Sequence, residues 1–139
     1  LKSILTPHYS EFSKIFNINI DKLLADPIGV IKEVEEQLSG RSLILKGPST
    51  IIVDGNKNKY IMNNGSIKLS VAGTGDVLAG ICAGLLTQNI SISDTMLCST
   101  MLHAECARQF TNRIPNSNLT AYDLIKMIPY AMSELNEIS

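Results

Sequence analysis

Hydrophobic residues along this chain recur at two spacings, and each spacing predicts a different kind of element. Short apolar runs bounded by turn residues predict strands at residues 3–5, 42–45, 50–53 and 59–62. Apolar positions at steps of three and four predict helices at 10–16, 21–24 and 27–38, and from 76 onward, 93–110 and 120–135. We expect Ser10 to cap the first helix, with Ser13 as an alternative start. Pro27 fits the first turn of the third helix, and Gly40 ends that helix.

The order of these elements predicts an α/β domain. Residues 42–45 form a compact apolar run typical of a buried parallel strand, and Asp54-Gly55-Asn56 predicts a hairpin between the next two strands. We therefore expect a small, mostly parallel sheet with a hairpin, flanked by helices. Without an internal linker, residues 1–139 are expected to form a single domain. Four strands make a narrow sheet, so we interpret the chain as the C-terminal part of a larger domain.

Composition excludes several classes of function. The 139 residues carry a net charge of −1, only 5% are aromatic and none is Trp, which argues against a nucleic-acid or membrane-surface partner. From the sequence pattern we expect neither a signal peptide nor an apolar run long enough to span a bilayer. Cys82, Cys98 and Cys106 fall in apolar helical segments, so we expect reduced core thiols and a cytoplasmic location.

The segment Gly73-Thr74-Gly75-Asp76 is the strongest candidate for chemistry. It is a glycine turn that opens an apolar helix, where free N–H groups and the helix dipole favour a phosphate-like anion. Asp76 in the same turn can accept a proton from a hydroxyl beside that anion. The string is neither a dinucleotide fingerprint nor a P-loop. On local grounds alone, an ordinary helix start explains most strings of this kind.

Two further polar clusters follow predicted strands. Thr6-Pro7-His8 comes after residues 3–5, and Lys46–Thr50 comes after 42–45, at the ends where open α/β sheets bind ligands. The local alternatives are a hydrogen-bonded turn histidine and a tight turn into the hairpin. His103 and Cys106 lack a second ligand pair, so we interpret them as core residues of a helix and expect no protein metal site.

Taken together and in this order, the motifs resemble the ADP/ATP-dependent NAD(P)H-hydrate dehydratases of the ribokinase-like superfamily. The matching residues are Thr6-Pro7-His8 with Glu11-Phe12, Lys46-Gly47 with Thr50-Ile51-Ile52, Gly73 to Gly80, His103-Ala104, and Leu119 to Ile125. The glycine-Asp turn is shared with many small-molecule kinases, whereas Thr-Pro-His-x-x-Glu-Phe is much more specific to this family. The resemblance spans nearly the whole chain and implies the C-terminal half of a ribokinase-like layered fold.

The resemblance also implies site residues, residue by residue. His8 and Asp76 would contact the hydrated dinucleotide, with Asp76 as the catalytic residue. The adenine-nucleotide site would be lined by Lys46, Gly47, Pro48, Ser49, Thr50 and Gly75. The amides of Gly73, Thr74, Gly75 and Asp76 would form an anion hole.

The implied reaction is phosphorylation of the hydroxyl on the hydrated nicotinamide ring by ADP or ATP, followed by loss of phosphate to regenerate NADH or NADPH. Mg²⁺ is expected on the nucleotide phosphates. The substrates would be NADHX or NADPHX and an adenine nucleotide, which makes the protein a lyase of metabolite repair.

The chain departs from the family pattern in two respects. The family usually has Gly where this chain has Ser10, and often Pro where it has Tyr9. Family members are also considerably longer, and their N-terminal part supplies further strands and dinucleotide contacts. Two alternatives therefore stay open: a vitamin-precursor or sugar kinase with the same turn, and a truncated nucleotide-binding remnant without activity. An incomplete sheet favours a homo-oligomer or association with the missing N-terminal half.

Overall fold

The computed structural model describes residues 3–63 and 65–137, which fall into two compact units on either side of residue 64. The assignment of residues 1–139 to a single domain stays a prediction. The first unit contains β1 (Ile4–Leu5), α1 (Tyr9–Phe16), α2 (Ile20–Ala25), α3 (Pro27–Val34), the 3-10 helix η1 (Glu35–Leu38), β2 (Ser42–Leu45), β3 (Thr50–Val53) and β4 (Lys59–Met62). The second contains the 3-10 helix η2 (Ile67–Ser70), α4 (Thr74–Leu86), α5 (Ile92–Arg113) and α6 (Ala121–Glu137).

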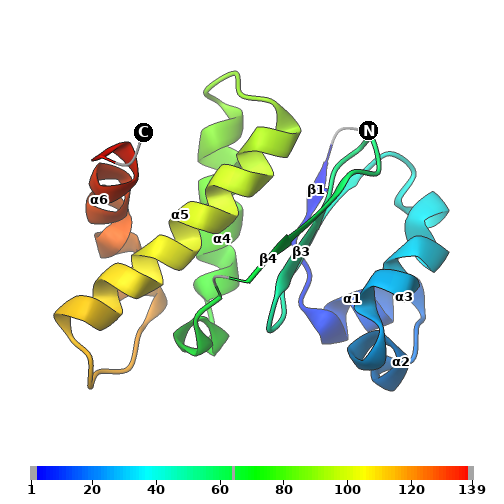
Figure 1. Cartoon of the computed structure of the whole chain (residues 1–139), viewed down its shortest axis with the longest axis horizontal. Coiled ribbons are helices and arrows are strands. Elements are labelled where there is room, and N and C mark those ends of the chain that lie inside the picture. The colour runs from blue at the N-terminus through cyan, green and yellow to red at the C-terminus, as the bar shows by residue number, and fades with distance from the viewer. Residues whose placement is uncertain (1–2, 64, 138–139) are drawn as a thin grey trace. The chain divides into compact units, whose positions relative to one another are not determined.

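The first unit is a four-stranded sheet whose strands lie in the order β1-β2-β3-β4 (Figure 1). β1 and β2 run parallel, whereas β2–β3 and β3–β4 are antiparallel. The α/β class and the hairpin are confirmed, but the expectation of a mostly parallel sheet was wrong. Only residues 46–49 join β2 to β3, and a connection that short cannot make the crossover that parallel strands need.

Helices α1–α3 cover one face of this sheet (Figure 1). Leu43 and Leu45 of β2, and Ile51 and Val53 of β3, alternate with residues of the opposite face, and they pack in one buried cluster with the helices. The helical side of the cluster consists of Phe12, Phe16, Leu23, Val30, Ile31, Val34 and Leu38. β1 and β2 of this sheet end at Leu5 and Leu45, directly before predicted site residues.

The start of α3 agrees with its sequence signals. Asp26 is the N-cap, its Oδ1 accepts the Gly29 N–H at 2.9 Å, and Pro27 occupies the first turn. The helix tightens into η1 and ends at Ser39, which adopts a left-handed conformation one residue before Gly40. The predicted start at Pro27 is therefore confirmed, whereas the α-helix ends at Val34 and its 3-10 continuation is capped by Ser39 and not by Gly40.

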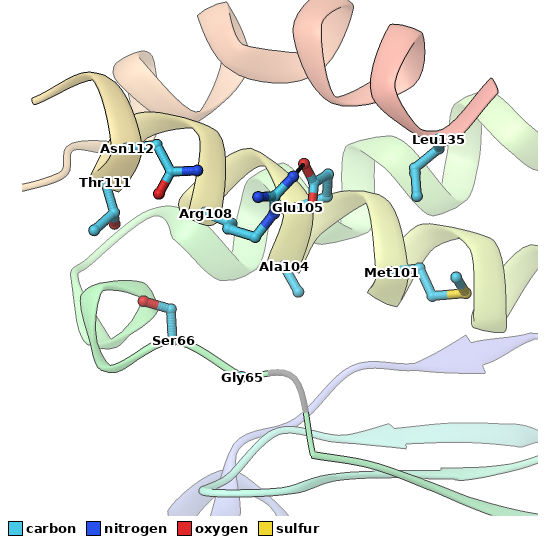
Figure 2. Close-up of a pocket in the computed structure, with 9 residues that line it drawn as sticks. All are labelled: Gly65, Ser66, Met101, Ala104, Glu105, Arg108, Thr111, Asn112 and Leu135. Carbon is cyan, nitrogen blue, oxygen red and sulfur yellow. Dashed lines mark hydrogen bonds and ion pairs between the residues drawn. The ribbon is translucent and has the colours of Figure 1, made fainter. Parts of the chain in front are cut away.

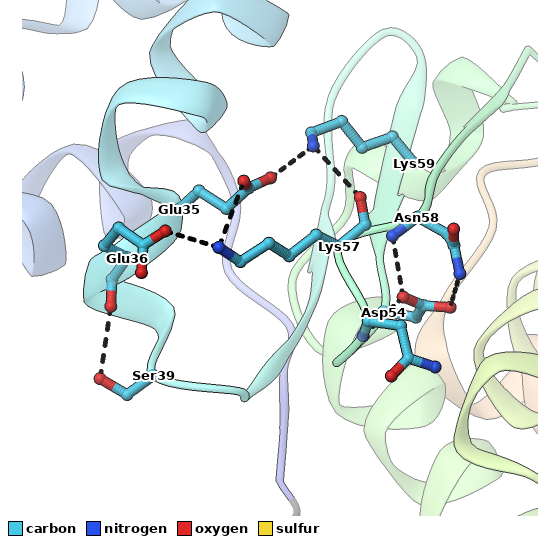
Figure 3. A network of polar contacts seen from close by, with 8 residues as sticks. Glu35, Glu36, Ser39, Asp54, Lys57, Asn58 and Lys59 are labelled. Carbon is cyan, nitrogen blue, oxygen red and sulfur yellow. Dashed lines mark hydrogen bonds and ion pairs between the residues drawn. The ribbon is translucent and has the colours of Figure 1, made fainter.

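Charged side chains tie η1 to the hairpin (Figure 3). Lys57 Nζ lies 2.5 Å from Glu36 Oε1 and 3.8 Å from Glu35 Oε2, while Lys59 bonds Glu35 as well. At the hairpin turn, buried Asp54 accepts the backbone N–H groups of Asn56 and Asn58, both at 2.9 Å. The Asp54 bonds satisfy backbone N–H groups of the turn, and the lysine–glutamate pairs hold the hairpin against η1.

The second unit is helical. Its core joins α4, α5 and α6 through a cluster that includes Val77, Ile81, Cys106, Phe110 and Leu124. Ser91 caps α5 by accepting the Asp94 N–H at 3.0 Å, and Pro129 lies inside α6. In the part of the chain that the structure describes, no helix is both long and apolar enough to cross a membrane.

Candidate functional site

His8 begins α1, directly after β1. It is the N-cap of the helix: its Nδ1 accepts the Glu11 N–H at 3.2 Å, and its own N–H donates to Glu11 Oε2 at 2.8 Å. This reciprocal arrangement is a capping box with histidine in place of serine or threonine. The predicted cap at Ser10 was wrong, because His8 reaches the third helical amide first. The specific Thr-Pro-His-x-x-Glu-Phe motif therefore includes a helix start, with Phe12 fully buried behind it.

The capping bond determines which ring nitrogen of His8 can act on a ligand. Because Nδ1 accepts a hydrogen bond, the proton of the neutral imidazole is on Nε2. Nε2 lies 3.4 Å from Glu11 Oε1, and the His8 side chain is 54% exposed. The His8 backbone N–H holds the pKa of the Glu11 carboxyl below its ordinary value, with smaller contributions from His8, Lys46 and Lys14. His8 therefore presents an Nε2–H donor to solvent, beside the Glu11 carboxylate.

The second polar cluster lies beside the first. The Lys46 N–H donates to the Pro7 carbonyl at 2.9 Å, and His8 and Lys46 form an isolated parallel bridge. The parallel pairing of β1 with β2 therefore brings together two motifs that are 38 residues apart (46 − 8). This juxtaposition agrees with the expectation that both clusters lie at the carboxyl ends of parallel strands.

Tyr9 is a site neighbour that sequence reasoning missed. Its half-buried ring lies on the backbone of Gly47, so closely that a Cβ at Gly47 would be 2.5 Å from Tyr9 Cε1. Burial raises the pKa of the Tyr9 hydroxyl. A hollow of about 310 Å³ opens beside this contact, and it is lined by Tyr9, Leu24, Pro27, Ile28, Pro48, Ser49, Ile51 and Ile61. The departure from the family pattern at Tyr9 was the signal in the sequence.

The glycine turn is built within the second unit. Gly73 is the N-cap of α4 with φ +85°, a left-handed conformation that favours glycine, and a Cβ there would lie 3.1 Å from Ala121 Cβ. Thr74 is buried, and its hydroxyl lies 2.7 Å from the Leu69 carbonyl and 2.8 Å from that of Val71. Asp76 is the third helical residue and is exposed. The turn therefore presents a carboxylate to solvent at a helix N-terminus.

Two of the four amides in the predicted anion hole already have acceptors. The Thr74 N–H donates to Val71 O at 3.3 Å, and the Asp76 N–H donates to Gly73 O at 3.1 Å. Among the described residues, the amides of Gly73 and Gly75 have no backbone acceptor outside the helix's own ladder. An anion at this turn would therefore meet the Gly73 and Gly75 N–H groups first, close to the positive end of α4.

His103 contacts the same turn from α5. It is buried in α5, and its Nε2 is 2.8 Å from the Thr74 carbonyl oxygen. Cys106, one turn further along α5, is fully buried, and that burial raises its pKa to about 12. Within the described ranges, no group of three His, Cys, Asp or Glu side chains is arranged to hold a metal ion. The expectation of three core thiols was wrong for Cys98, which lies on the exposed side of α5.

A larger hollow, of about 560 Å³, lies beside α5 (Figure 2). Its lining comes from the segment before η2, from α5 and from α6: Gly65, Ser66, Met101, Ala104, Glu105, Arg108, Thr111, Asn112 and Leu135. Arg108 is paired with Glu105 through two bonds of 2.7 Å, which lowers the pKa of the Glu105 carboxyl. None of the predicted site residues lines this hollow.

The predicted residues thus form two groups. His8 and Lys46–Thr50 adjoin one another in the first unit, and Gly73–Asp76 forms a helix start in the second.

Comparison with known proteins assigns the family. The family model described as NAD(P)H-hydrate dehydratase matches residues 1–130. The chain is 31% identical to the ADP-dependent (S)-NAD(P)H-hydrate dehydratase of Cenarchaeum symbiosum, over 97% of this chain and 46% of the relative. It therefore spans about half the length of that relative.

Solved structures confirm the fold. The ADP/ATP-dependent NAD(P)H-hydrate dehydratase of Bacillus subtilis, crystallised with ATP and Mg²⁺, superposes with a TM-score of 0.86 at 28% identity, covering 94% of this chain and 47% of that one. A ribokinase-like superfamily protein of Enterococcus faecalis superposes with a TM-score of 0.70 at 22% identity, covering 94% of this chain and 44% of the other. The fold is therefore ribokinase-like.

Proposed function

The chain belongs to the NAD(P)H-hydrate dehydratase family, and from that premise we propose that it carries the nucleotide and base elements of an ADP- or ATP-dependent NAD(P)HX dehydratase. The substrates in this proposal are NADHX or NADPHX and an adenine nucleotide. The observation that carries it is the Gly73–Asp76 turn, which combines an exposed carboxylate with helix-start amides. That pair is the minimum equipment for moving a phosphoryl group onto an alcohol.

In the proposed reaction, Asp76 orients the hydroxyl of the hydrated nicotinamide ring. The hydroxyl oxygen attacks the terminal phosphorus of the nucleotide, the bond from that phosphorus to its bridging oxygen breaks, and AMP leaves from ADP or ADP leaves from ATP. The Asp76 carboxylate accepts the hydroxyl proton late in the transfer. An exposed Asp is a weak base, which suits a loose transition state that depends on positioning and charge stabilisation. The phosphorylated ring then releases inorganic phosphate, and the ring double bond of NADH or NADPH is restored.

The amides of Gly73 and Gly75 would hold the transferring phosphoryl group. They are the helix-start donors without a backbone acceptor among the described residues, and they adjoin the carboxylate in sequence. Preorganised donors aimed at developing charge are an effective form of catalysis. Gly75 would therefore belong to both the anion hole and the nucleotide site.

Lys46, Gly47, Pro48, Ser49 and Thr50 would line the nucleotide, and His8 would contact the dinucleotide through its Nε2–H. The bond from Lys46 to Pro7 and the contact of Tyr9 with Gly47 support this part of the proposal, because they hold the two loops in one local structure. Mg²⁺ would be held by phosphate oxygens, since the described residues offer no cluster of protein ligands. Bound there, it would neutralise charge on the phosphates.

The chain spans about half of its Cenarchaeum relative. We therefore propose that the working site also needs either the portion that corresponds to the rest of the relative or a second copy of this chain. The exposed side of α4 is consistent with such a partner, because Gly80 and Gly84 have no atom within 4 Å of where a Cβ would stand.

The test is recovery of nicotinamide absorbance from NADHX with Mg²⁺ and this chain, with ADP and ATP in parallel reactions. Recovery that requires a nucleotide and is absent from Asp76→Asn supports the proposal. Transfer of phosphate to a vitamin precursor or sugar, without recovery of NADH, would instead support the kinase alternative. ADP binding without either reaction, even after the N-terminal half of a relative is added, would contradict the proposed activity and support a nucleotide-binding remnant.

A further inference from the structure

His103 holds the backbone of the glycine turn from a position 29 residues away in sequence. Its Nε2 lies 2.8 Å from the Thr74 carbonyl oxygen, and its side chain is 7% exposed. A carbonyl oxygen only accepts hydrogen bonds, so Nε2 carries the proton and the imidazole is the donor. Because a carbonyl has two lone pairs, this bond leaves room for the bond within the helix.

Thr74 is held on its other side as well. Its hydroxyl lies within 2.8 Å of two carbonyl oxygens of the preceding segment, those of Leu69 and Val71, and only 4% of the residue is exposed. Thr74 stands between Gly73 and Gly75, which place few restrictions of their own on the backbone. The contacts of this one residue therefore fix a turn that glycine would otherwise leave loose.

We propose that His103 is a positioning residue. Through the Thr74 carbonyl it sets the orientation of the first turn of α4, and with it the Gly73 and Gly75 amides and the Asp76 carboxylate. The consequence for turnover rests on the proposed function, whereas the consequence for the turn does not. A metal role is not consistent with the site, since the nearby Cys106 is fully buried and no third ligand is grouped with it among the described residues.

Three variants separate the effect of the His103 hydrogen-bond donor from the effect of its side-chain volume. His103→Gln keeps an N–H donor at about the reach of Nε2. His103→Leu fills similar space without a donor, and His103→Asn is polar but too short to reach Thr74. Hydrogen exchange is measured at the amides of Asp76 and Val77, which both donate to Gly73 O at 3.1 and 3.2 Å. The amide of Leu124 in α6 reports on the rest of the unit.

We expect exchange at Asp76 and Val77 to accelerate by about threefold to tenfold in the Leu and Asn variants, with Leu124 unchanged, because one hydrogen bond is lost. In His103→Gln it should stay within about twofold of the wild type. If the exchange rates at the Asp76 and Val77 amides are the same in all three variants, the inference is overturned. Equal acceleration at Leu124 overturns it as well, since His103 would then support the unit as a whole.

The separate effects on kcat and on KM distinguish positioning of Asp76 from a general structural role of His103. In the NADHX assay, His103→Leu should lower kcat by about tenfold while KM for ADP changes by less than about threefold, and His103→Gln should recover kcat. A loss confined to KM contradicts positioning of Asp76. Absence of turnover in the wild-type chain, also after the N-terminal half of a relative is added, tells against the proposed function alone, and the exchange measurement still decides the role of His103.

Discussion

A methyl group added at Gly47 should collide with the ring of Tyr9. The built Cβ would lie 2.5 Å from Tyr9 Cε1, 2.9 Å from Cζ and 3.1 Å from the hydroxyl oxygen. Ordinary carbon–carbon contacts are about 3.5–4.0 Å, so the ring must retreat by roughly 1 Å. Gly47 has no left-handed backbone conformation, and Ala is therefore compatible with its dihedral angles. The contact with Tyr9 alone decides the outcome.

The expected cost follows from the surroundings of the ring. Overpacking a filled site costs about 1–3 kcal/mol. Here the Tyr9 ring borders a hollow of about 310 Å³ into which it can move. We therefore expect Gly47→Ala to lower the free energy of unfolding by the smaller part of that range, about 1–2 kcal/mol.

A double-mutant cycle with denaturant unfolding measures this term. In a Tyr9→Ala background, Gly47→Ala should cost less than about 0.5 kcal/mol, which gives a coupling energy of about 1 kcal/mol between the two residues. Gly80→Ala is the matched control: a Cβ there meets nothing within 4 Å, so alanine should stabilise α4 by about 0.5–1 kcal/mol. Equal costs of Gly47→Ala in both backgrounds would refute the reasoning.

Three further outcomes are expected. Asp76→Asn should abolish turnover, while ADP affinity stays within a few-fold of the wild type and the free energy of unfolding within about 0.5 kcal/mol, because the side chain is exposed. A large loss of ADP binding, measured by calorimetry, would contradict the role of Asp76 as the base. His8→Ala should lower the free energy of unfolding by about 1 kcal/mol through the lost cap, and it should weaken dinucleotide binding more than ADP binding. His8→Ser should restore the cap but not the dinucleotide affinity. Recovery of both stability and dinucleotide affinity by Ser would remove His8 from the substrate site. The pKa of Glu11 is lowered in the folded state, so the stabilising effect of its carboxylate is complete above the unfolded pKa of about 4.3 and is lost as the pH falls through the lower folded value. The difference in stability between the wild type and Glu11→Gln should therefore vanish in acid. A difference that does not depend on pH would refute the assignment.

Several features of the site could be predicted from the sequence because they depend on neighbours a few residues apart. The glycine turn at Gly73 and the start of α3 at Pro27 follow from local backbone preferences, and the helix predicted from residue 76 begins two residues earlier, at Thr74. The position of Lys46 beside His8 was predictable too, since parallel strands carry their C-terminal residues to one edge.

Other features were decided only by the structure, because the local sequence pattern fits more than one arrangement. Whether Ser10 or His8 caps α1 is decided by the geometry of one turn, and both residue types fit the local pattern. The antiparallel pairing of β2 with β3 follows from the four-residue connection once both strands exist, although residues 42–45 read as a parallel strand.

The sequence by itself determined the elements, the glycine-Asp turn and the motifs that identify the family, since each of these resides in short-range backbone and side-chain preferences. Only the tertiary structure decided that the Tyr9 ring rests on Gly47 and that the His103 N–H donates to Thr74. The physical reason is that a side chain chooses its partner among groups brought close by packing, and a hydrogen bond across 29 residues leaves no periodic trace in the sequence.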